Sequence, residues 1–532
     1  MMIQPGRTSQ VEQDKSIHIF VAAHTNVGKT ALLRTILGKD VGVVEDAPDI
    51  TSATASHSLV ADADGSALLI WDSPGFGDSF RLARRFRLRY RWLTWLVREV
   101  WDRRVQPSLW RSQRLVLDLQ KQADIVLYPV NLLERPAEAV YVAPELEVLG
   151  WTGKPVVVIL NQSGSRGDAI SRIAEWREFL GGFPAVRSVI DLDAFTRCWL
   201  QELKLFEEIG RLLPDTSHQS YQRLAKVLTS EHLKRFDESI AAIVDHLMQT
   251  AGDRAELDTA WFSGVAEAID LVRNKLPWGK SKEQRPQERA MEDLAQRLAT
   301  RVSDLANRLV AINRLNGVTS ADVLRVAATH MRVDGPLNAS TVSLVGSVVS
   351  GVLTGLSADL ISGGLTLGTG ALVGGVMGAL GGAVIAQGYN VLTSKDKKVI
   401  RWSPKSIFDA LDNSILLYLS VAHFGRGQGD WRKKDAPSQW SSAVLHARGR
   451  YQYRLDQLCS ADGLMANAQR DRREYTLVVR GLLQEVLIHL YPSESAVLSS
   501  EGPAYANWDG LDTRGSKRDP QRNSGEPLHT PT

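Results

Sequence analysis

The feature that most constrains the fold is an apolar run that breaks into a short polar loop and then into a helical pattern. The run SIHIFVAA covers residues 16–23, and the helical pattern TALLRTILGKD begins at Thr30. Between them, residues 23–30 read AHTNVGKT, which matches the phosphate-loop pattern GxxxxGK[ST] except that Ala23 stands at the first glycine. A strand before this pattern and a helix after it are the context that a phosphate loop requires. The sequence therefore predicts a nucleotide-binding α/β domain.

The residues of this loop have distinct expected roles. Backbone N–H groups and the helix N-terminus face the phosphates, Lys29 reaches the β and γ phosphates, and the hydroxyl of Thr30 binds Mg²⁺. The alternative is a chance GKT at a helix start. Alanine at the first position favours that alternative, because a Cβ resists a positive φ angle. The candidate phosphate-binding residues are Ala23, His24, Thr25, Asn26, Val27, Gly28, Lys29 and Thr30.

Two further motifs are expected at the Mg²⁺ and the γ-phosphate. The apolar run ALLIWD leads into DSPG, where Asp72 is expected to hold the Mg²⁺ shell and the N–H of Gly75 to sense the γ-phosphate. Asp-x-Pro-Gly alone is a common turn, but its distance past GKT makes it specific here. Between the two motifs lies DITSATASHS, in which Thr54 is the preferred switch threonine over Mg²⁺ and Thr51 is the alternative.

A fourth motif, NQSG, ends the strand-like run KPVVVILN, where a guanine-binding Asn-Lys-x-Asp is expected. Asn161 and Gln162 are the candidate base-binding residues. Gly164 replaces the aspartate, which removes the carboxylate that would accept hydrogen bonds from guanine. A site without its hydrogen-bonding partner loses much of its discrimination. The protein is therefore expected to bind guanine weakly, to use Asp168 or another loop, or to accept other bases.

Phe76 follows the glycine of DSPG, where many phosphate-loop hydrolases place a glutamine or histidine that orients the attacking water. A phenyl ring cannot orient water, so slow intrinsic hydrolysis is expected. Positioning and charge stabilisation carry most of the catalysis of phosphoryl transfer. The candidate catalytic residues are Asn26, Lys29 and Thr54.

The distribution of strand and helix patterns divides the chain. Nearly all-apolar runs at 67–72, 124–131 and 154–161 are typical of parallel strands covered on both faces. From about residue 216 the pattern changes to long helical segments at 219–250, 256–275, 286–314, 403–422 and 438–491, with little strand signal. The predicted organisation is a flexible N-terminus 1–15, an α/β domain 16–215, a helical region 216–340, a glycine-rich apolar hairpin 341–394, a helical region 395–498 and a disordered tail 499–532.

Residues 79–114 form a basic aromatic insertion after DSPG that is longer than a switch loop needs. Apolar residues including Leu82 and Phe86 approximate one helical face, and arginines surround it, so a basic amphipathic helix is predicted. One interpretation is that the apolar face packs on the C-terminal helices. Others are docking on an anionic membrane surface, or binding to nucleic acid or a protein partner.

Residues 341–394 contain one charge, Asp359, between two apolar stretches that are long enough to span a hydrocarbon core. Glycines recur every four residues from Gly370 to Gly382, which lets another backbone approach closely. Basic residues flank both ends, so an inserted hairpin would keep both ends on the cytosolic side. The alternative is a buried soluble hairpin, because glycine is a poor helix former.

The order and spacing of the motifs resemble the translation-factor-related GTPases, in particular the Era-like and tRNA-modification GTPases, whose phosphate loops carry asparagine where this chain has Asn26. Segments such as YVAPELEVLGWTGKPVVVILNQSG, DLDAFTRCW and YLSVAHFGRGQGDW resemble a bacterial GTPase family with a C-terminal domain of unknown function, over about residues 16–490. This resemblance implies a Ras-like α/β domain, binding of GTP with Mg²⁺, use of K⁺ through Asn26, and G domains that pair as a homodimer.

Composition limits the remaining possibilities. Lys and Arg number 63 against 60 Asp and Glu, and a net charge of +3 is too small to make nucleic acid the main expected partner. The polar start carries no apolar secretion signal. We therefore expect a GTP-hydrolysing switch in the cytoplasm, at the cytosolic face of the inner membrane. The alternatives are a membrane structural or pore-like protein with a non-hydrolysing nucleotide domain, and a soluble RNA- or ribosome-associated GTPase.

Overall fold

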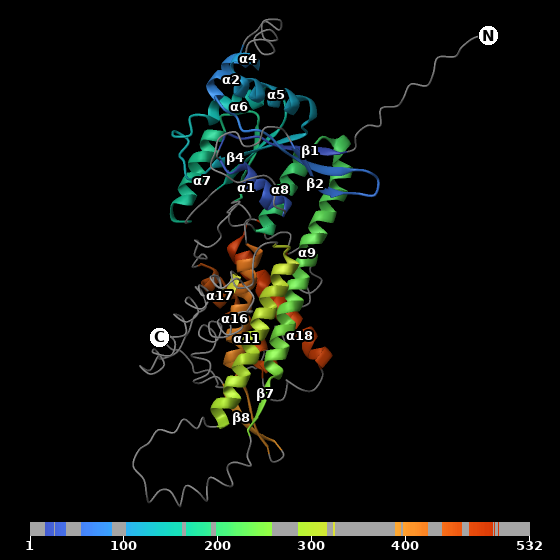
Figure 1. The fold of residues 1–532 in the computed structure, drawn as a ribbon, viewed down its shortest axis with the longest axis vertical. Helices are drawn as coiled ribbons and strands as arrows, with labels where there is room; N and C mark the ends of the chain where they lie inside the picture. The colour runs from blue at the N-terminus through green and yellow to red at the C-terminus, as the bar shows by residue number, and fades with distance from the viewer. Residues whose placement is uncertain are drawn as a thin grey trace, which may run out of the picture.

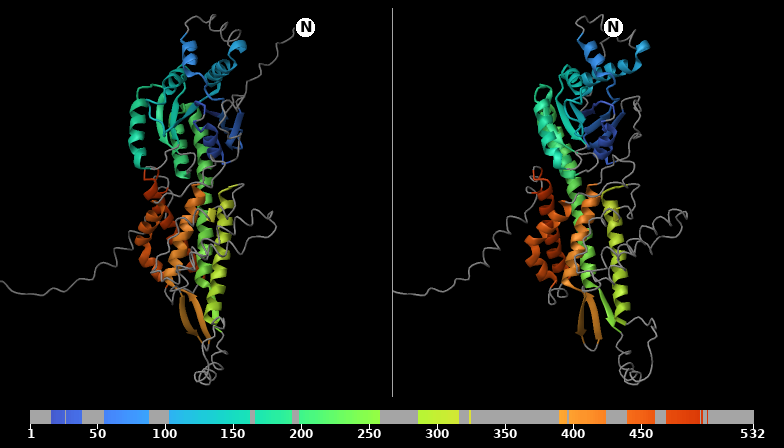
Figure 2. Two further views of the ribbon diagram at one scale, coloured as in Figure 1. Left: turned by 60° about the vertical axis from the view of Figure 1, so that its left-hand side comes forward. Right: turned by 90° about the vertical axis from the view of Figure 1, so that its left-hand side faces the viewer.

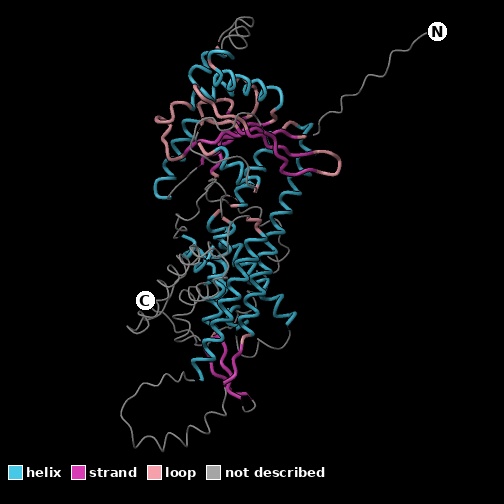
Figure 3. The backbone as a smooth tube through the Cα atoms, viewed as in Figure 1, coloured by secondary structure: helices cyan, strands magenta, loops and turns pink. Residues whose placement is uncertain are grey.

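The computed structural model is elongated, with an α/β domain at one end, a helical bundle in the middle and a small sheet at the other end (Figures 1 and 2). The structure describes residues 16–25, 27–38, 55–87, 103–161, 166–192, 198–257, 286–315, 323–324, 389–394, 397–423, 439–459, 468–492, 494 and 498. Strands gather in two separate places, one in the α/β domain and one near the opposite end of the molecule (Figure 3).

The α/β domain is built on a six-stranded sheet with the order β2-β3-β1-β4-β5-β6. All neighbours pair in parallel except β2 and β3, which form an antiparallel hairpin. The strands are β1 (Ile17–Val21), β2 (Ala55–Ala61), β3 (Ala67–Asp72), β4 (Ile125–Asn131), β5 (Val156–Asn161) and β6 (Val186–Asp191). The helices are α1 (Lys29–Leu37), α2 (Ser79–Phe86), α4 (Arg103–Val105), α5 (Pro107–Gln122), α6 (Val142–Gly150), α7 (Arg166–Leu180) and α8 (Trp199–Leu212).

The central strands are apolar throughout because helices cover both faces of the sheet. Every residue of β5 is buried, and alternate side chains enter two different cores. Val157 and Ile159 pack on the face that carries α1 and α8, whereas Val158 and Leu160 pack with α2, α5, α6 and α7. This confirms the predicted Ras-like α/β domain with a mostly parallel sheet. It also brings the carboxyl ends of β1, β3 and β5 to the same edge, where ligands bind in such sheets.

The second half is mainly helical, as predicted. Its long helices are α9 (Asp215–Gly252), α11 (Pro286–Ile312), α16 (Pro404–Ala422), α17 (Gln439–Cys459) and α18 (Ala468–Leu490). Helix α9 has 38 residues and so extends over about 57 Å at 1.5 Å per residue. It leaves the α/β domain and continues through the bundle in every view (Figures 1 and 2). One apolar core is continuous from the α8 face of the sheet into the bundle, so the two halves share buried side chains.

The helical interpretation of the second half missed two features. A small antiparallel sheet with the order β7-β9-β8 lies beyond the bundle, formed by β7 (Arg254–Leu257), β8 (Tyr389–Ser394) and β9 (Lys397–Trp402). The segment 438–491 is two helices, α17 and α18, which pack against each other. Four- to six-residue strands that pair with distant partners give too short a pattern to be recognised against the surrounding helices.

The end of the predicted glycine-rich hairpin differs from expectation, because its last six residues form β8. The rest of that segment, 341–388, lies outside the described residues, as do the N-terminus 1–15 and the tail 499–532. Within the described ranges, no helix combines the length and the apolarity that a membrane crossing requires.

The basic insertion is not one described helix. Helix α2 ends at Phe86, and the chain is described again from Arg103, where the short α4 and then α5 begin. The apolar side of α2 does not pack on the C-terminal helices. Leu82 is fully buried in the α/β core, and the ring of Phe86 lies 5.4 Å from that of Trp151 at the end of α6. Residues 88–102, which contain the rest of the predicted apolar face, lie outside the described residues.

Candidate functional site

The predicted phosphate loop connects β1 to α1, as its sequence indicated. Gly28 precedes the helix with φ 84° and ψ 23°, a left-handed conformation that glycine adopts at low cost. No side chain caps α1, and its first turn contains no acidic residue. The backbone N–H groups at this N-terminus are therefore available to an anion, and the helix dipole favours a negative charge there.

Ala23 fits its position without backbone strain. Among the described non-glycine residues only Arg314 has a positive φ angle, so Ala23 does not need the conformation that glycine provides. Its side chain is fully buried beside the sheet. The departure from GxxxxGK[ST] therefore does not count against a phosphate loop in this chain.

Lys29 and Asp72 meet at the carboxyl edge of the sheet. Their side chains form an ion pair, and both are nearly inaccessible to solvent. A buried charge is tolerated when an opposite charge satisfies it, and each member of this pair satisfies the other. The Asp72 carboxylate and the Thr30 hydroxyl are hard oxygen ligands of the kind that Mg²⁺ prefers, so these residues fit a Mg²⁺-bound nucleotide.

Gly75 lies directly against the phosphate loop. A Cβ at this position would be 2.9 Å from Cγ2 of Thr25 and 3.2 Å from its backbone N, which leaves no room for a side chain. The next residue, Phe76, donates its backbone N–H to the carbonyl of Ala23 at 2.8 Å. Its phenyl ring is fully buried in the core of the α/β domain. The ring therefore points into the protein interior, where it cannot contact a water at the phosphates.

Asn161 joins the end of β5 to the phosphate loop. Its side chain is fully buried and donates a hydrogen bond from Nδ2 to the carbonyl of Val27 at 3.2 Å, across 134 residues of sequence. Gln162 and Gly164, and the side chain of Asp168, lie outside the described residues, as do Asn26, Thr54 and Thr51. Of the predicted site, the structure thus brings together the described loop residues, Asp72, Gly75 and Asn161.

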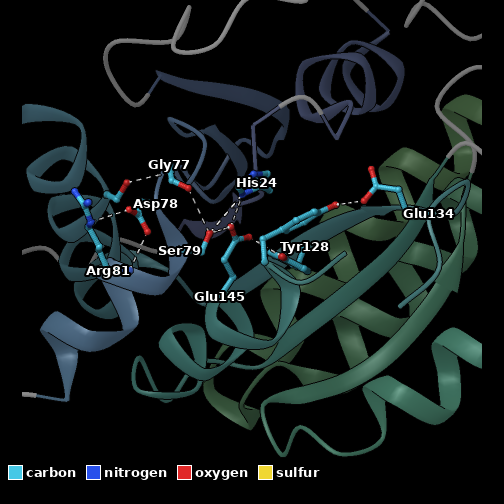
Figure 4. A network of polar contacts seen from close by, with 10 residues as sticks. His24, Gly77, Asp78, Ser79, Arg81, Tyr128, Glu134 and Glu145 are labelled. Carbon is cyan, nitrogen blue, oxygen red and sulfur yellow. Dashed lines mark hydrogen bonds and ion pairs between the residues drawn. The ribbon is translucent and has the colours of Figure 1, made fainter. Parts of the chain in front are cut away.

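Sequence reasoning missed a buried carboxylate beside the loop, Glu145 on α6 (Figure 4). Nδ1 of His24 lies 2.7 Å from Oε1 of Glu145, and the hydroxyl of Ser79, the first residue of α2, donates to the same oxygen. The hydroxyl of Tyr128 on β4 donates to Oε2 at 2.6 Å. Glu145 therefore bonds the phosphate loop and the start of α2 at once.

The surroundings of Glu145 are apolar and aromatic. The His24 ring stacks on Tyr141 with ring centres 4.1 Å apart. Burial raises the pKa of Glu145, while the hydrogen bonds from His24, Ser79 and Tyr128 act in the opposite direction. Burial and the nearby carboxylate raise the pKa of Tyr128 well above its usual value. The only signal in the sequence was a glutamate on the apolar face of a helix, spaced with Val142 and Leu149.

Two family models match the sequence. Residues 18–162 match the model described as a 50S ribosome-binding GTPase. Residues 184–484, more than half of the chain, match the model described as a domain of unknown function, DUF3482. No curated protein matches the sequence. The first match ends just after β5 and the second begins just before β6, so the second model includes the last strand of the α/β domain.

Several solved structures are similar to part of the chain. One is Era in complex with MgGDPNP and nucleotides of 16S ribosomal RNA, with 18% identity, covering 38% of this chain and 58% of that chain at a TM-score of 0.27. Another is Era of Aquifex aeolicus bound to GDP and AlF4−, with 14% identity, 55% and 86% coverage and a TM-score of 0.28. A third is a probable GTP-binding protein engB, with 20% identity, 36% and 99% coverage and a TM-score of 0.22. The chain thus spans little more than half of the first of these proteins.

Proposed function

Because the chain belongs to the family defined by the DUF3482 domain of unknown function and carries a P-loop GTPase domain before it, we propose that it is a GTP-hydrolysing molecular switch with slow intrinsic turnover. The observation that carries this proposal is the buried pair of Lys29 and Asp72 at the open N-terminus of α1. A phosphate chain would give Lys29 a new anionic partner there. Asp72 would then be free to hold the Mg²⁺ shell.

Different residues of the site would hold the phosphates and the Mg²⁺ ion of the bound nucleotide. Lys29 and the N–H groups at the start of α1 bind the phosphates, and Gly75 brings its N–H close enough to sense a γ-phosphate. Thr30 and Asp72 would hold Mg²⁺, with Thr54 as a further ligand. When bound, the ion neutralises charge on the phosphate oxygens. Slow turnover is expected because the residue after Gly75 is Phe76, whose buried ring offers no polar group to orient the attacking water.

Guanine is the proposed base, held by Asn161 and Gln162. Asn161 supports this role because its side chain lies at the end of β5 and fixes the loop at Val27. The test is binding of labelled GTP, ATP and XTP to the purified full chain, with Lys29→Ala as the control. Selective GTP binding that the control loses is the expected result. Equal binding of all three nucleotides, or full affinity in Lys29→Ala, would overturn the proposal.

We place the protein at the cytosolic face of the inner membrane. The supports are the glycine-rich sequence of 341–388 and the exposed side chains of α2, where Phe80 is 61% exposed and Arg81 and Arg84 are exposed too. Flotation of the full chain with anionic liposomes, with and without GTP, tests this placement. Recovery of the protein only in the dense fraction under both conditions would contradict it.

A soluble RNA- or ribosome-associated GTPase is the second candidate. It is favoured by the matching model described as a 50S ribosome-binding GTPase and by the exposed arginines of α2. RNA binding through arginine weakens steeply as salt rises, whereas insertion of apolar residues does not. An RNA pulldown at two salt concentrations, run beside the flotation assay, separates the candidates.

Pairing of two G domains would appear as a GTP-dependent dimer in light scattering.

A further inference from the structure

The segment from Gly75 to Ser79, between the phosphate loop and α2, is attached at both ends. At its start, the Phe76 ring is fully buried in the α/β core and its N–H bonds the carbonyl of Ala23. At its end, Ser79 is 3% exposed and its hydroxyl bonds Glu145. The first attachment is mainly apolar, whereas the second includes a hydrogen bond to a buried carboxylate.

That carboxylate also reaches the phosphate loop. Oε1 of Glu145 receives both the Ser79 hydroxyl and Nδ1 of His24, so one atom connects two segments that are 55 residues apart in sequence. Glu145 itself is fully buried on α6, whose position is fixed by apolar residues of the same core. Because α6 holds Glu145 in place, its Oε1 fixes the two donors that meet there, and loss of either bond would leave a buried polar group without a partner.

We propose that Glu145 is a positioning residue for hydrolysis, acting through His24 and Ser79 to hold the segment 75–79 at a fixed place beside the phosphates. This inference rests on the proposed function. With a phenylalanine after Gly75, no side chain at that position orients water, so the backbone of this segment must be well placed instead. Glu145 reaches the phosphate loop through the His24 side chain, whereas Lys29 and the start of α1 are the groups proposed to hold the phosphates. Its loss is therefore expected to affect the rate of the chemical step more than the affinity for GTP.

The expected change in kcat can be estimated from how strongly a rate depends on the position of a catalytic group. Displacement of a catalytic group by about 1 Å costs up to about 10²-fold in rate. Ser79→Ala removes the hydroxyl that links α2 to Glu145 and to His24, and Glu145→Gln keeps the size of the side chain. We expect each change to lower kcat by about tenfold to a hundredfold. KM for GTP should change by less than about threefold, because Lys29 and the start of α1 remain in place.

Tyr128→Phe is the matched control. Tyr128 donates to the other oxygen of Glu145 from β4 and contacts neither the phosphate loop nor α2 through that bond. Its removal should lower the melting temperature but leave kcat near the wild-type value. The double variant Ser79→Ala/Glu145→Gln should be no slower than Glu145→Gln alone, because both changes break the same connection.

A second measurement is independent of turnover. Hydrogen exchange of the nucleotide-free protein, followed by mass spectrometry of the peptide that covers 76–87, reports how often this segment opens. Exchange should be faster in Ser79→Ala and Glu145→Gln and unchanged in Tyr128→Phe. Wild-type exchange and kcat in the first two variants, or an equal loss of kcat in Tyr128→Phe, would overturn the inference. If the wild type fails to hydrolyse GTP, the proposed function fails, while the exchange comparison still decides whether Glu145 holds the segment.

Discussion

Lys29 of the phosphate loop and Asp72 at the end of β3 form a buried ion pair at the carboxyl edge of the sheet. Each charge is a partner for the other, so neither is left uncompensated in the interior. The pair therefore couples the stability of the α/β domain to its ability to bind phosphate. A change at either residue is expected to show in both properties.

Removal of the lysine tests this coupling. Lys29→Ala should abolish GTP binding, and it should lower the free energy of unfolding by about 3 to 5 kcal/mol because the Asp72 carboxylate stays buried without a partner. Nucleotide titration and urea denaturation measure the two effects. In Lys29→Ala/Asp72→Asn much of the stability should return while GTP binding stays absent. A double variant as unstable as the single one would contradict this account.

The close contact of Gly75 with Thr25 predicts a steric effect. Gly75→Ala places a Cβ 2.9 Å from Cγ2 of Thr25, so the loop must shift, and we expect a destabilisation of about 1 to 3 kcal/mol with loss of hydrolysis. Gly77→Ala is the matched control, because no atom lies within 4 Å of a Cβ there. Thr25→Ser removes Cγ2 and should rescue Gly75→Ala in part. Equal stability of the two alanine variants in denaturant would count against the contact.

The buried side chain of His246 on α9 is expected to make the stability of the folded protein depend on pH. Burial lowers its pKa to about 4, and the nearby charge of Arg301 acts in the same direction. The unfolded chain binds a proton below about pH 6.5, whereas the folded protein does so only near pH 4, so stability is full above pH 6.5 and falls as the pH drops towards 4. The loss from His246 between pH 7.5 and 4.5 should be about 2 to 3 kcal/mol.

The comparison that isolates this effect is between wild type and His246→Leu at each pH. Asp412, whose pKa is raised by burial to about 7, acts in the opposite direction over the same range, because its protonated form is favoured in the folded protein. It is present in both proteins and cancels in the difference. If the unfolding curves of the two proteins shift in parallel with pH, His246 does not titrate as predicted.

Potassium dependence is predicted from Asn26, a position outside the described residues. If this side chain recruits K⁺ to supply charge at the phosphates, wild-type hydrolysis should be faster in K⁺ than in Na⁺, and Asn26→Ala should lose the difference. Steady-state phosphate release in the two salts at equal ionic strength measures it. Identical rates of both proteins in both salts would exclude this role.

The outline of the nucleotide site was predictable because its motifs are short and contiguous. The order of strand, loop and helix around Lys29 follows from local patterns, and the DSPG motif follows from the end of an apolar strand. The small sheet was not predictable, because β7 pairs with β9 across more than 140 residues and neither strand is long enough to stand out. The orientation of the Phe76 ring could not be predicted either, because the sequence shows that this side chain is apolar but not where it packs.

The sequence by itself determined a phosphate loop in an α/β domain and a mainly helical second half, since periodicity and turn residues act over a few neighbouring positions. Only the tertiary structure decided which distant side chains meet. Glu145 lies 121 residues from His24, and Asn161 lies 134 residues from Val27, yet each pair is in contact. Such contacts depend on how helices and strands pack in three dimensions, and a helix pattern shows which residues share a face but not which segment will cover that face.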